Sequence, residues 1–164
     1  MNAKYRPQSE VVTNKVDWGD LSWVSRPSDN QAKCITEIVV NLEPSFGHNF
    51  HTHPRQEEVI YVMEGEVEQW LETGKKILKA GDAVFIGPGV VHASFNVGKQ
   101  SAKFLVVLSP CIGDGGYETE EVADKAPWNT LRQEKGLVYS SCPRGQNEPR
   151  GRLYNAAPTS LFAR

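Results

Sequence analysis

Between residues 33 and 108, short apolar runs alternate with polar turns. Lys33–Leu42 (KCITEIVVNL) and Glu58–Met63 (EVIYVM) are rich in β-branched or aromatic residues, and Glu-Pro at 43–44 and Glu-Gly at 64–65 mark the turns after them. No stretch here keeps an apolar period of about 3.6 residues for three turns, so at most marginal helices are expected. Further candidate strands are Phe46–His53, Glu66–Glu72, Lys76–Leu78, Ala83–Ile86, Val91–Val97 and Lys103–Leu108. This spacing predicts an all-β fold, an antiparallel sandwich or small barrel.

The residues on either side of this region differ from it in character. Residues 1–30 mix polar positions with a few large apolar ones and predict an N-terminal arm or covering strand. The candidate barrel occupies residues 31–110, and an acidic, glycine-rich connector follows at 111–126. Residues 127–164 hold six Lys or Arg against two Glu, a net charge of +4 that leaves −6 for the rest. They show no periodicity and predict an irregular tail, with a lid or partner-binding segment as the alternative.

Composition then narrows the class of protein. The 164 residues suffice for one domain, and the net charge of −2 gives no reason to expect nucleic acid or an anionic membrane as a partner. No apolar run approaches the roughly 18 residues of a membrane helix, and Met1–Glu10 does not resemble a signal peptide. Three widely spaced cysteines, Cys34, Cys111 and Cys142, are typical of a reducing compartment, so we expect a cytoplasmic protein.

Histidine is scarce and clustered. The chain has four: His48, His51 and His53 fall within six residues, and His92 lies far along the sequence. Two histidines at positions i and i+2 of a strand point to the same face, so His51 and His53 can reach one metal ion at about 2.1 Å. A His-x-His pair by itself is a weak signal, because exposed or hydrogen-bonded histidines are more common than ligands.

Two later residues strengthen the metal hypothesis. Glu58 shares a strand face with Ile60 and Val62, and a lone carboxylate on an apolar face is costly unless it is paired or ligated. His92 follows a Gly-Pro-Gly turn at the head of another short strand and can supply a fourth ligand. Three imidazoles and one carboxylate suit one divalent Fe, Mn, Ni, Cu or Zn ion better than Ca or Mg. Four protein ligands leave a coordination position open for substrate or dioxygen.

These residues resemble the two motifs of the cupin superfamily. In the first motif, His51-Thr52-His53, Glu58 and Gly65 fall in register, while Gly47 stands three residues before His51 where the family has five. In the second motif the glycines, histidine and asparagine fit, and the proline is one place late; the residues are Gly81, Gly87, Pro88, Gly89, His92 and Asn96. The resemblance covers roughly residues 33–108, and the short spacing between the motifs is close to that of compact, mostly microbial members.

The resemblance implies a single-domain cupin, a small double-sheet jelly-roll barrel that holds a metal ion with His51, His53, Glu58 and His92. It also implies a homodimer, often formed by exchanged N-terminal strands, for which Trp18 and Trp23 are candidate surface residues. His48 does not fall at a ligand position, and we interpret it as a supporting or exposed residue.

A few other side chains are candidates for the substrate site or the core. Gln69 shares a predicted inner face with Val67 and is either a substrate-orienting amide or a satisfied core amide. Trp70 points the other way, and we expect the N-terminal arm or a partner subunit to cover it. Phe85 and Phe104, like Phe95, are interpreted first as core residues, with substrate stacking as the alternative. Cys111 is interpreted as a small buried side chain rather than a thiol near the metal.

The sequence leaves two main functions open. The first is a metal-dependent, dioxygenase-like enzyme acting on a small organic acid, phenol or enol, with Glu58 as a ligand or also as a base; decarboxylase or isomerase activity is the close alternative. The second is a non-catalytic module that binds or senses a small molecule. A storage or structural role ranks last, and no helix-turn-helix segment supports a transcription factor.

Overall fold

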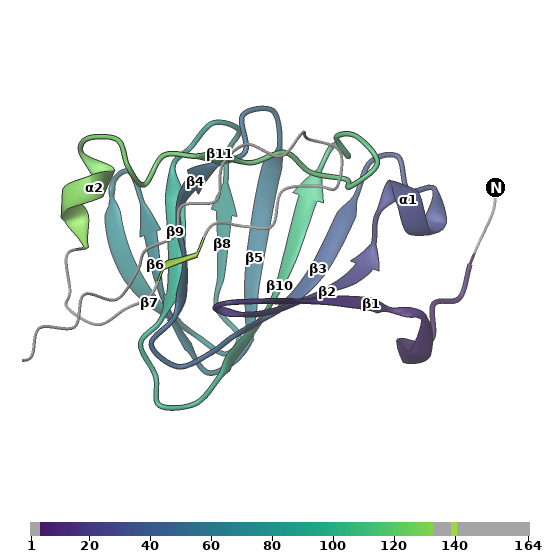
Figure 1. Cartoon of the computed structure of the whole chain (residues 1–164), viewed down its shortest axis with the longest axis horizontal. Coiled ribbons are helices and arrows are strands. Elements are labelled where there is room, and N and C mark those ends of the chain that lie inside the picture. Colours follow the sequence, from purple (N-terminus) through teal and green to yellow (C-terminus); the bar gives the residue numbers. More distant parts are fainter. Residues whose placement is uncertain (1–3, 133–138, 141–164) are drawn as a thin grey trace, which may run out of the picture.

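The computed structural model describes residues 4–132 and 139–140, which form two packed antiparallel β-sheets (Figure 1). The first sheet has the order β1 (Val12–Val16), β2 (Gly19–Ser25), β3 (Thr36–Leu42), β10 (Ala102–Ser109), β5 (Glu57–Glu64), β8 (Ala83–Ile86). The second has the order β11 (Glu120–Glu121), β4 (Gly47–Thr52), β9 (His92–Asn96), β6 (Glu66–Leu71), β7 (Gly74–Lys79), and β12 (Tyr139–Ser140) pairs in parallel with β4. The all-β, double-sheet prediction is confirmed, although hydrogen bonds do not close the sheets into one barrel.

Helical structure is limited to single turns in the described residues. These are a 3-10 turn at Gln8–Glu10, α1 (Pro27–Asn30) and α2 (Trp128–Leu131). No helix in the part of the chain described is long and apolar enough to cross a membrane.

Each strand predicted between residues 33 and 108 is present, as β3 to β10, with ends shifted by a few residues at most. One turn shows why glycine was a reliable boundary signal. Gly65, between β5 and β6, has a φ of +81°, and a Cβ atom there would lie 2.9 Å from Ala102 Cα. Only a residue without a side chain combines this left-handed conformation with so close an approach. The turn therefore fixes where β5 ends and β6 begins.

The main core lies between the two sheets. In β3 and β10, buried positions alternate with partly exposed ones, so that Ile38, Val40, Val106 and Leu108 point inward. The N-terminal residues belong to this core, because β1 and β2 form a hairpin that extends the first sheet beside β3.

The N-terminal tryptophans are core residues, contrary to the expectation that they form a dimer surface. Trp18 is 1% exposed and Trp23 is 4% exposed. The indole nitrogen of Trp23 donates a hydrogen bond to Asn14 Oδ1 across the hairpin, at 2.7 Å. The hairpin folds back on its own sheet and so uses these large side chains within one chain.

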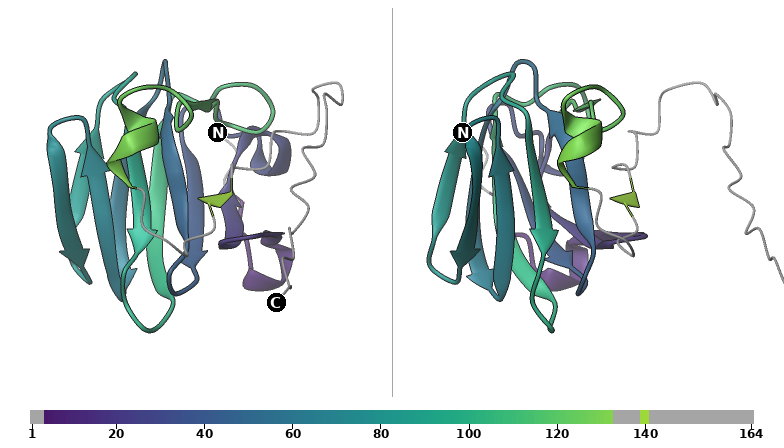
Figure 2. Two further views of the ribbon diagram at one scale, coloured as in Figure 1. Left: turned by 60° about the vertical axis from the view of Figure 1, so that its left-hand side comes forward. Right: turned by 90° about the vertical axis from the view of Figure 1, so that its left-hand side faces the viewer.

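A second apolar cluster covers the outer face of the second sheet. A bulge in β4 between His48 and His51 turns Phe50 outward, where its ring lies 5.7 Å from that of Trp70 and 5.4 Å from that of Trp128. Val122 completes the cluster from the connector, and α2 lies against this sheet (Figures 1 and 2). The N-terminal arm does not cover Trp70, because it extends the first sheet; Trp70 instead packs against the cluster that contains Phe50 and Val122.

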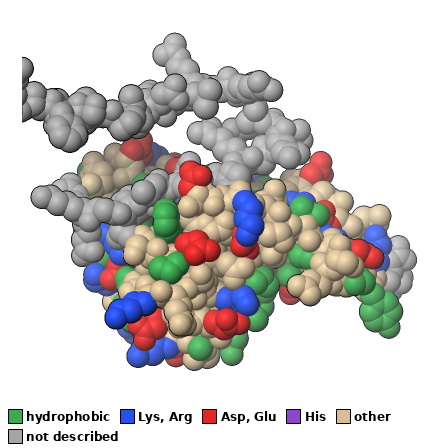
Figure 3. Space-filling view, turned by 60° about the horizontal axis from the view of Figure 1, so that its bottom comes forward, with side chains coloured by type: hydrophobic (Ala, Val, Ile, Leu, Met, Phe, Trp, Pro, Cys, Tyr) green, Lys and Arg blue, Asp and Glu red, His purple; other side chains and the backbone are tan. Residues whose placement is uncertain are grey.

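Most of the tail predicted for residues 127–164, including Cys142, lies outside the described residues. At the end of the molecule shown in Figure 3, acidic, basic and hydrophobic side chains are interspersed among the described residues.

Candidate metal centre

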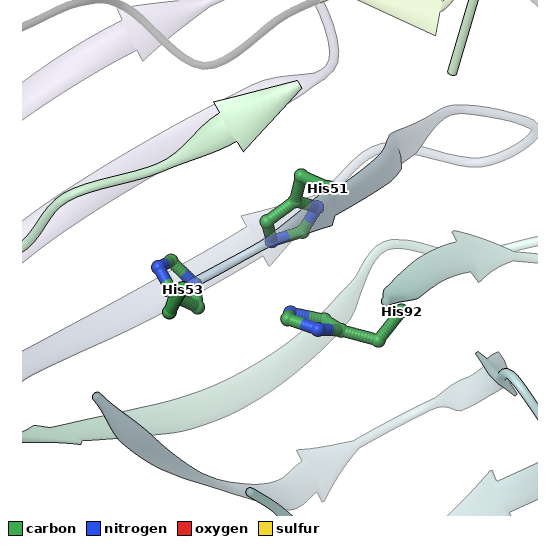
Figure 4. Close-up of side chains that lie close together, drawn as sticks. All are labelled: His51, His53 and His92. Carbon is green, nitrogen blue, oxygen red and sulfur yellow. The ribbon is translucent and has the colours of Figure 1, made fainter. Parts of the chain in front are cut away.

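Three histidine side chains converge between the sheets (Figure 4). His51 lies in β4, His53 follows that strand directly, and His92 begins β9. β4 and β9 are antiparallel neighbours in which His51 and His92 are direct partners, while the i, i+2 spacing brings His53 to the same side. All three residues are buried, and one nitrogen of each lies within 4.8 Å of the others.

Backbone carbonyls fix the orientation of all three rings. The Nδ1 atom of His51 lies 2.7 Å from the Asn49 carbonyl, that of His53 lies 2.5 Å from the Glu118 carbonyl, and that of His92 lies 3.0 Å from the Val90 carbonyl. A carbonyl oxygen only accepts, so each Nδ1 carries the proton and donates. In the neutral rings each Nε2 therefore keeps a free lone pair, the form in which imidazole binds a metal.

Glu58 brings a carboxylate to the same place from the first sheet. Its Oε2 atom lies 2.9 Å from His92 Nε2 and 3.6 Å from His53 Nε2. Burial by itself raises the pKa of this carboxyl, but the neighbouring imidazoles His92 and His53 outweigh it and lower the pKa to about 2. Glu58 is therefore ionised at neutral pH, whereas Glu57 beside it is exposed to solvent.

The same environment shifts the pKa values of the three histidines in different directions. Burial lowers the pKa of His51 well below its usual range and also lowers that of His53, so both rings are neutral at pH 7. Burial also acts against the charged form of His92, but the adjacent Glu58 carboxylate raises the pKa of His92 above its ordinary value.

The donor atoms fit a transition-metal ion. Ligands about 2.1 Å from a common ion lie roughly 3 Å apart when adjacent and about 4.2 Å apart when opposite. The separations in the structure, 2.9 Å, 3.6 Å and at most 4.8 Å, lie near this range. Apart from their mutual contact, His92 Nε2 and Glu58 Oε2 are buried without a hydrogen-bond partner. A divalent ion satisfies both atoms and removes the cost of burying them unpaired.

A mainly apolar cavity opens onto these donors. Besides the four donor residues it is lined by Trp18, Leu21, Ile38, Val40, His48, Ile60, Ser94, Phe104, Val106, Leu108 and Tyr117. The described residues that line it include no lysine or arginine. The cavity therefore favours an apolar molecule with a polar group at the histidine end.

The three residues predicted for the substrate site lie in different places in the structure. Phe104 lines the cavity. Gln69 is buried behind it, and its Oε1 accepts a hydrogen bond from Ser94 Oγ at 2.7 Å, so Ser94 is the residue that reaches the cavity. Phe85 is 61% exposed and is paired with Val59 on the outer face of the first sheet, so neither the core nor the cavity contains it.

Sequence reasoning missed other residues of the cavity wall. Tyr117 belongs to the connector, where nothing in the sequence marks an approach to the site. His48 lines the cavity with its ring stacked 3.8 Å from that of His51 and 5.4 Å from that of Trp18. Ring nitrogens lie in the ring plane, so this stacked ring does not direct a nitrogen at the ion that the other three surround.

Cys34 is exposed and Cys111 partly buried, and both thiols are free. Cys111 Sγ lies 3.5 Å from the Thr36 hydroxyl.

Comparison with known proteins assigns the fold to a family. Residues 38–108 match the family described as the cupin domain. Polyketide synthase CurC of Streptomyces cyaneus is 28% identical over 141 residues, which cover 80% of this chain and 92% of CurC. Oxalate oxidase GF-3.8 of Triticum aestivum is 35% identical over 111 residues, 63% of this chain but 46% of that protein. This chain thus spans less than half of the wheat enzyme.

A solved structure supports the same fold. KdgF from Halomonas sp. superposes with a TM-score of 0.61 at 19% identity, covering 69% of this chain and 98% of KdgF. Residues 38–108 therefore form a cupin domain, and the likeness to KdgF supports the same double-sheet fold for the chain.

Proposed function

We propose that the chain is a mononuclear metal-dependent enzyme in which His51, His53, Glu58 and His92 hold one divalent ion. The observation that carries this proposal is the set of three Nδ1-to-carbonyl hydrogen bonds, which turns three Nε2 atoms towards one another beside an ionised carboxylate. A bound ion would polarise a substrate oxygen or activate dioxygen at an open position. Glu58 serves as a ligand and is also placed to accept a proton from a substrate hydroxyl.

The cavity supports a phenolic or enolic substrate rather than a small dicarboxylate. A dicarboxylate with one end at the ion would leave its second charge against an apolar wall with no lysine or arginine among the described lining residues. A largely apolar substrate with an oxygen function at one end buries its carbon skeleton among side chains such as Phe104 and Leu108. The end-to-end match with a protein named polyketide synthase agrees with such a substrate, whereas the oxalate oxidase match covers less of that protein.

Metal analysis followed by a turnover screen tests this function. The purified protein is analysed for Fe, Mn, Ni, Cu and Zn, stripped, reloaded with each metal, and assayed for oxygen uptake and CO2 release. The panel contains phenols, enols and oxalate. We expect conversion of a phenol or enol with oxygen uptake; CO2 release without oxygen uptake would identify a decarboxylase. Stoichiometric metal with saturable binding and no conversion would favour the non-catalytic binding module.

We also propose that the chain forms a homodimer through the outer face of its first sheet. This face carries Val39, Val59, Tyr61, Phe85, Leu105 and Val107, which are neighbours through the pairings of β3, β10, β5 and β8. Met63, two residues after Tyr61 in β5, is also exposed. A solvated sheet face normally carries polar residues, so an apolar outer face indicates a covered one.

A second copy is the occupant that this face fits. Strands β10 and β5 have eight residues each, β3 has seven and β8 has four, so at a spacing of about 4.8 Å they span a flat area of roughly 400 Å². Side-chain relief raises this towards the ~800 Å² per partner of a standard interface. The centre of the face holds no charged side chain and the charges lie at its margin, among them the Lys103–Glu64 pair. Such a distribution is typical of homodimers.

A further inference from the structure

Gln56 is a fully buried residue that is neither a metal-site donor nor part of the cavity wall. It lies between His53 and Glu58 in the chain, just before β5, and is 0% exposed. A buried side-chain amide must find hydrogen-bond partners, and the choice of partners shows what the residue holds in place.

All the hydrogen bonds that Gln56 makes through its side chain reach one segment, residues 110–118. Its Nε2 donates to the Pro110 carbonyl at 2.6 Å and to the Gly116 carbonyl at 3.0 Å. Its Oε1 accepts from the Glu118 backbone N–H at 2.8 Å. The Thr36 hydroxyl also donates to the Gly116 carbonyl, at 2.8 Å. Gln56 therefore fixes both ends of this segment, which lies beyond the residues that match the cupin domain.

The same segment contacts the metal site. The carbonyl of Glu118 accepts the Nδ1–H of His53, while the N–H of that same residue donates to Gln56. Tyr117, one residue earlier, lines the cavity, with its ring 6.2 Å from that of His53. Residue 118 thus joins Gln56 to His53 through its own backbone.

We propose that Gln56 is a positioning residue for the metal centre. It holds the Glu118 carbonyl where that carbonyl keeps His53 in the Nδ1–H tautomer, with Nε2 free for the ion. Without Gln56 the segment is released and His53 is free to rotate or change tautomer. The metal part of this inference rests on the proposed function, whereas the tautomer part does not.

The side-chain ion pair beside this contact does not replace Gln56. Arg55 donates to both carboxylate oxygens of Glu118, at 2.8 and 2.7 Å, but this pair is exposed. Exposed ion pairs contribute little to stability. Arg55→Gln is therefore a matched control, because it weakens the exposed pair and leaves residue 118 unchanged.

Two substitutions of Gln56 separate its hydrogen bonds from its volume. Gln56→Leu keeps a similar volume and removes every side-chain hydrogen bond. Gln56→Glu keeps an acceptor for the Glu118 N–H and loses the donors to Pro110 and Gly116. Circular dichroism checks that each variant folds.

The first measurement is the tautomer of His53, read by 15N NMR in protein stripped of metal with a chelator. We expect Nδ1–H in the wild type and in Arg55→Gln, and a mixture with Nε2–H in both Gln56 variants. The second is the affinity for Zn²⁺ alone, from competition with a chromophoric chelator. We expect a loss of about 10- to 100-fold for the Gln56 variants and less than about twofold for Arg55→Gln.

Folded Gln56 variants with an unchanged His53 tautomer would overturn the proposal, and so would wild-type Zn²⁺ affinity in those variants. If the wild type binds no metal, the proposed function fails, and the tautomer measurement still decides the role of Gln56. If neither variant folds, the proposal is tested on the wild-type protein alone. Rapid hydrogen exchange of the Glu118 amide, or a proton on Nε2 of His53, would then refute it.

Discussion

At the scale of single residues, the plane of each imidazole ring distinguishes the candidate ligands from the other histidine. Hydrogen bonds to carbonyls turn the Nε2 atoms of His51, His53 and His92 towards one another. His48 stacks its face on His51 instead, close to the same ion in space but in the wrong orientation to bind it. Closeness to the site is therefore not enough to make a histidine a ligand. The hydrogen bond made by the other ring nitrogen determines whether Nε2 points at the ion.

His53→Ala is expected to abolish stoichiometric metal binding, because it removes one donor and leaves the Glu118 carbonyl without its partner. His48→Ala is expected to retain about one ion per chain. Elemental analysis after gel filtration measures both variants. Full metal occupancy in His53→Ala would contradict the proposed ligand set.

The sequence predicted the donor residues but not the residues that hold them. Strand parity placed His51 and His53 on one face, and the apolar neighbours of Glu58 placed it inside; the structure brings all of these side chains together with His92. Gln56 and Tyr117 escaped prediction because their roles depend on how residues 110–118 return to the site. Such a return is a long-range packing event that no local pattern specifies.

At the scale of elements, the second sheet has an apolar cover on its outer face, anchored by an ionic group. Glu68 in β6 accepts hydrogen bonds from Trp70 Nε1 and Lys75 Nζ, both at 2.9 Å, and its Oε1 lies 3.5 Å from Arg132 Nε. Arg132 follows α2 and lies over the ring of Phe95. Glu68 therefore links β6 to the segment that covers this sheet.

Glu68→Gln is expected to lower the free energy of unfolding at pH 7 by about 1 kcal/mol, because a charged acceptor of several hydrogen bonds is lost. Burial raises the pKa of Glu68, but hydrogen bonds from Lys75 and Trp70, aided by Arg132, lower it overall. A lowered pKa stabilises the fold above the unfolded pKa of about 4.5, and this contribution is lost as the pH falls through the folded value.

Urea unfolding at a series of pH values measures this dependence. The difference between wild type and Glu68→Gln should shrink steadily below about pH 4.5. Glu66→Gln is the control, since Glu66 makes only a more exposed pair with Lys79. A difference of constant size from pH 7 to pH 3 would contradict the ionic role of Glu68.

At the scale of the whole molecule, the outer face of one sheet is covered and that of the other is exposed. The connector and α2 cover the second sheet, while the first sheet leaves Tyr61, Met63 and Phe85 exposed. Sequence alternation predicted the inner faces of the strands well. It could not predict which outer face the chain covers itself, because that depends on the path of residues 109–132.

Phe85→Glu is expected to weaken self-association at least about 30-fold, because it replaces the most exposed apolar side chain of the proposed interface with a charge. Ile77→Glu is the matched control, since Ile77 is also an exposed apolar residue but lies on β7 in the other sheet. Sedimentation equilibrium over a range of concentrations measures both variants. A monomeric wild type, or equal effects of the two substitutions, would refute the proposed interface.

The donors of the candidate metal site come from both layers of the fold. His51 and His92 extend from the second sheet and Glu58 from the first, so an ion held by all of them would act as a cross-link between the layers. Free metal at about 100 times its dissociation constant would add ~2.7 kcal/mol to stability. The lifetime of the folded protein would then follow the supply of metal, and a shortage would expose the protein to proteolysis as well as inactivate it.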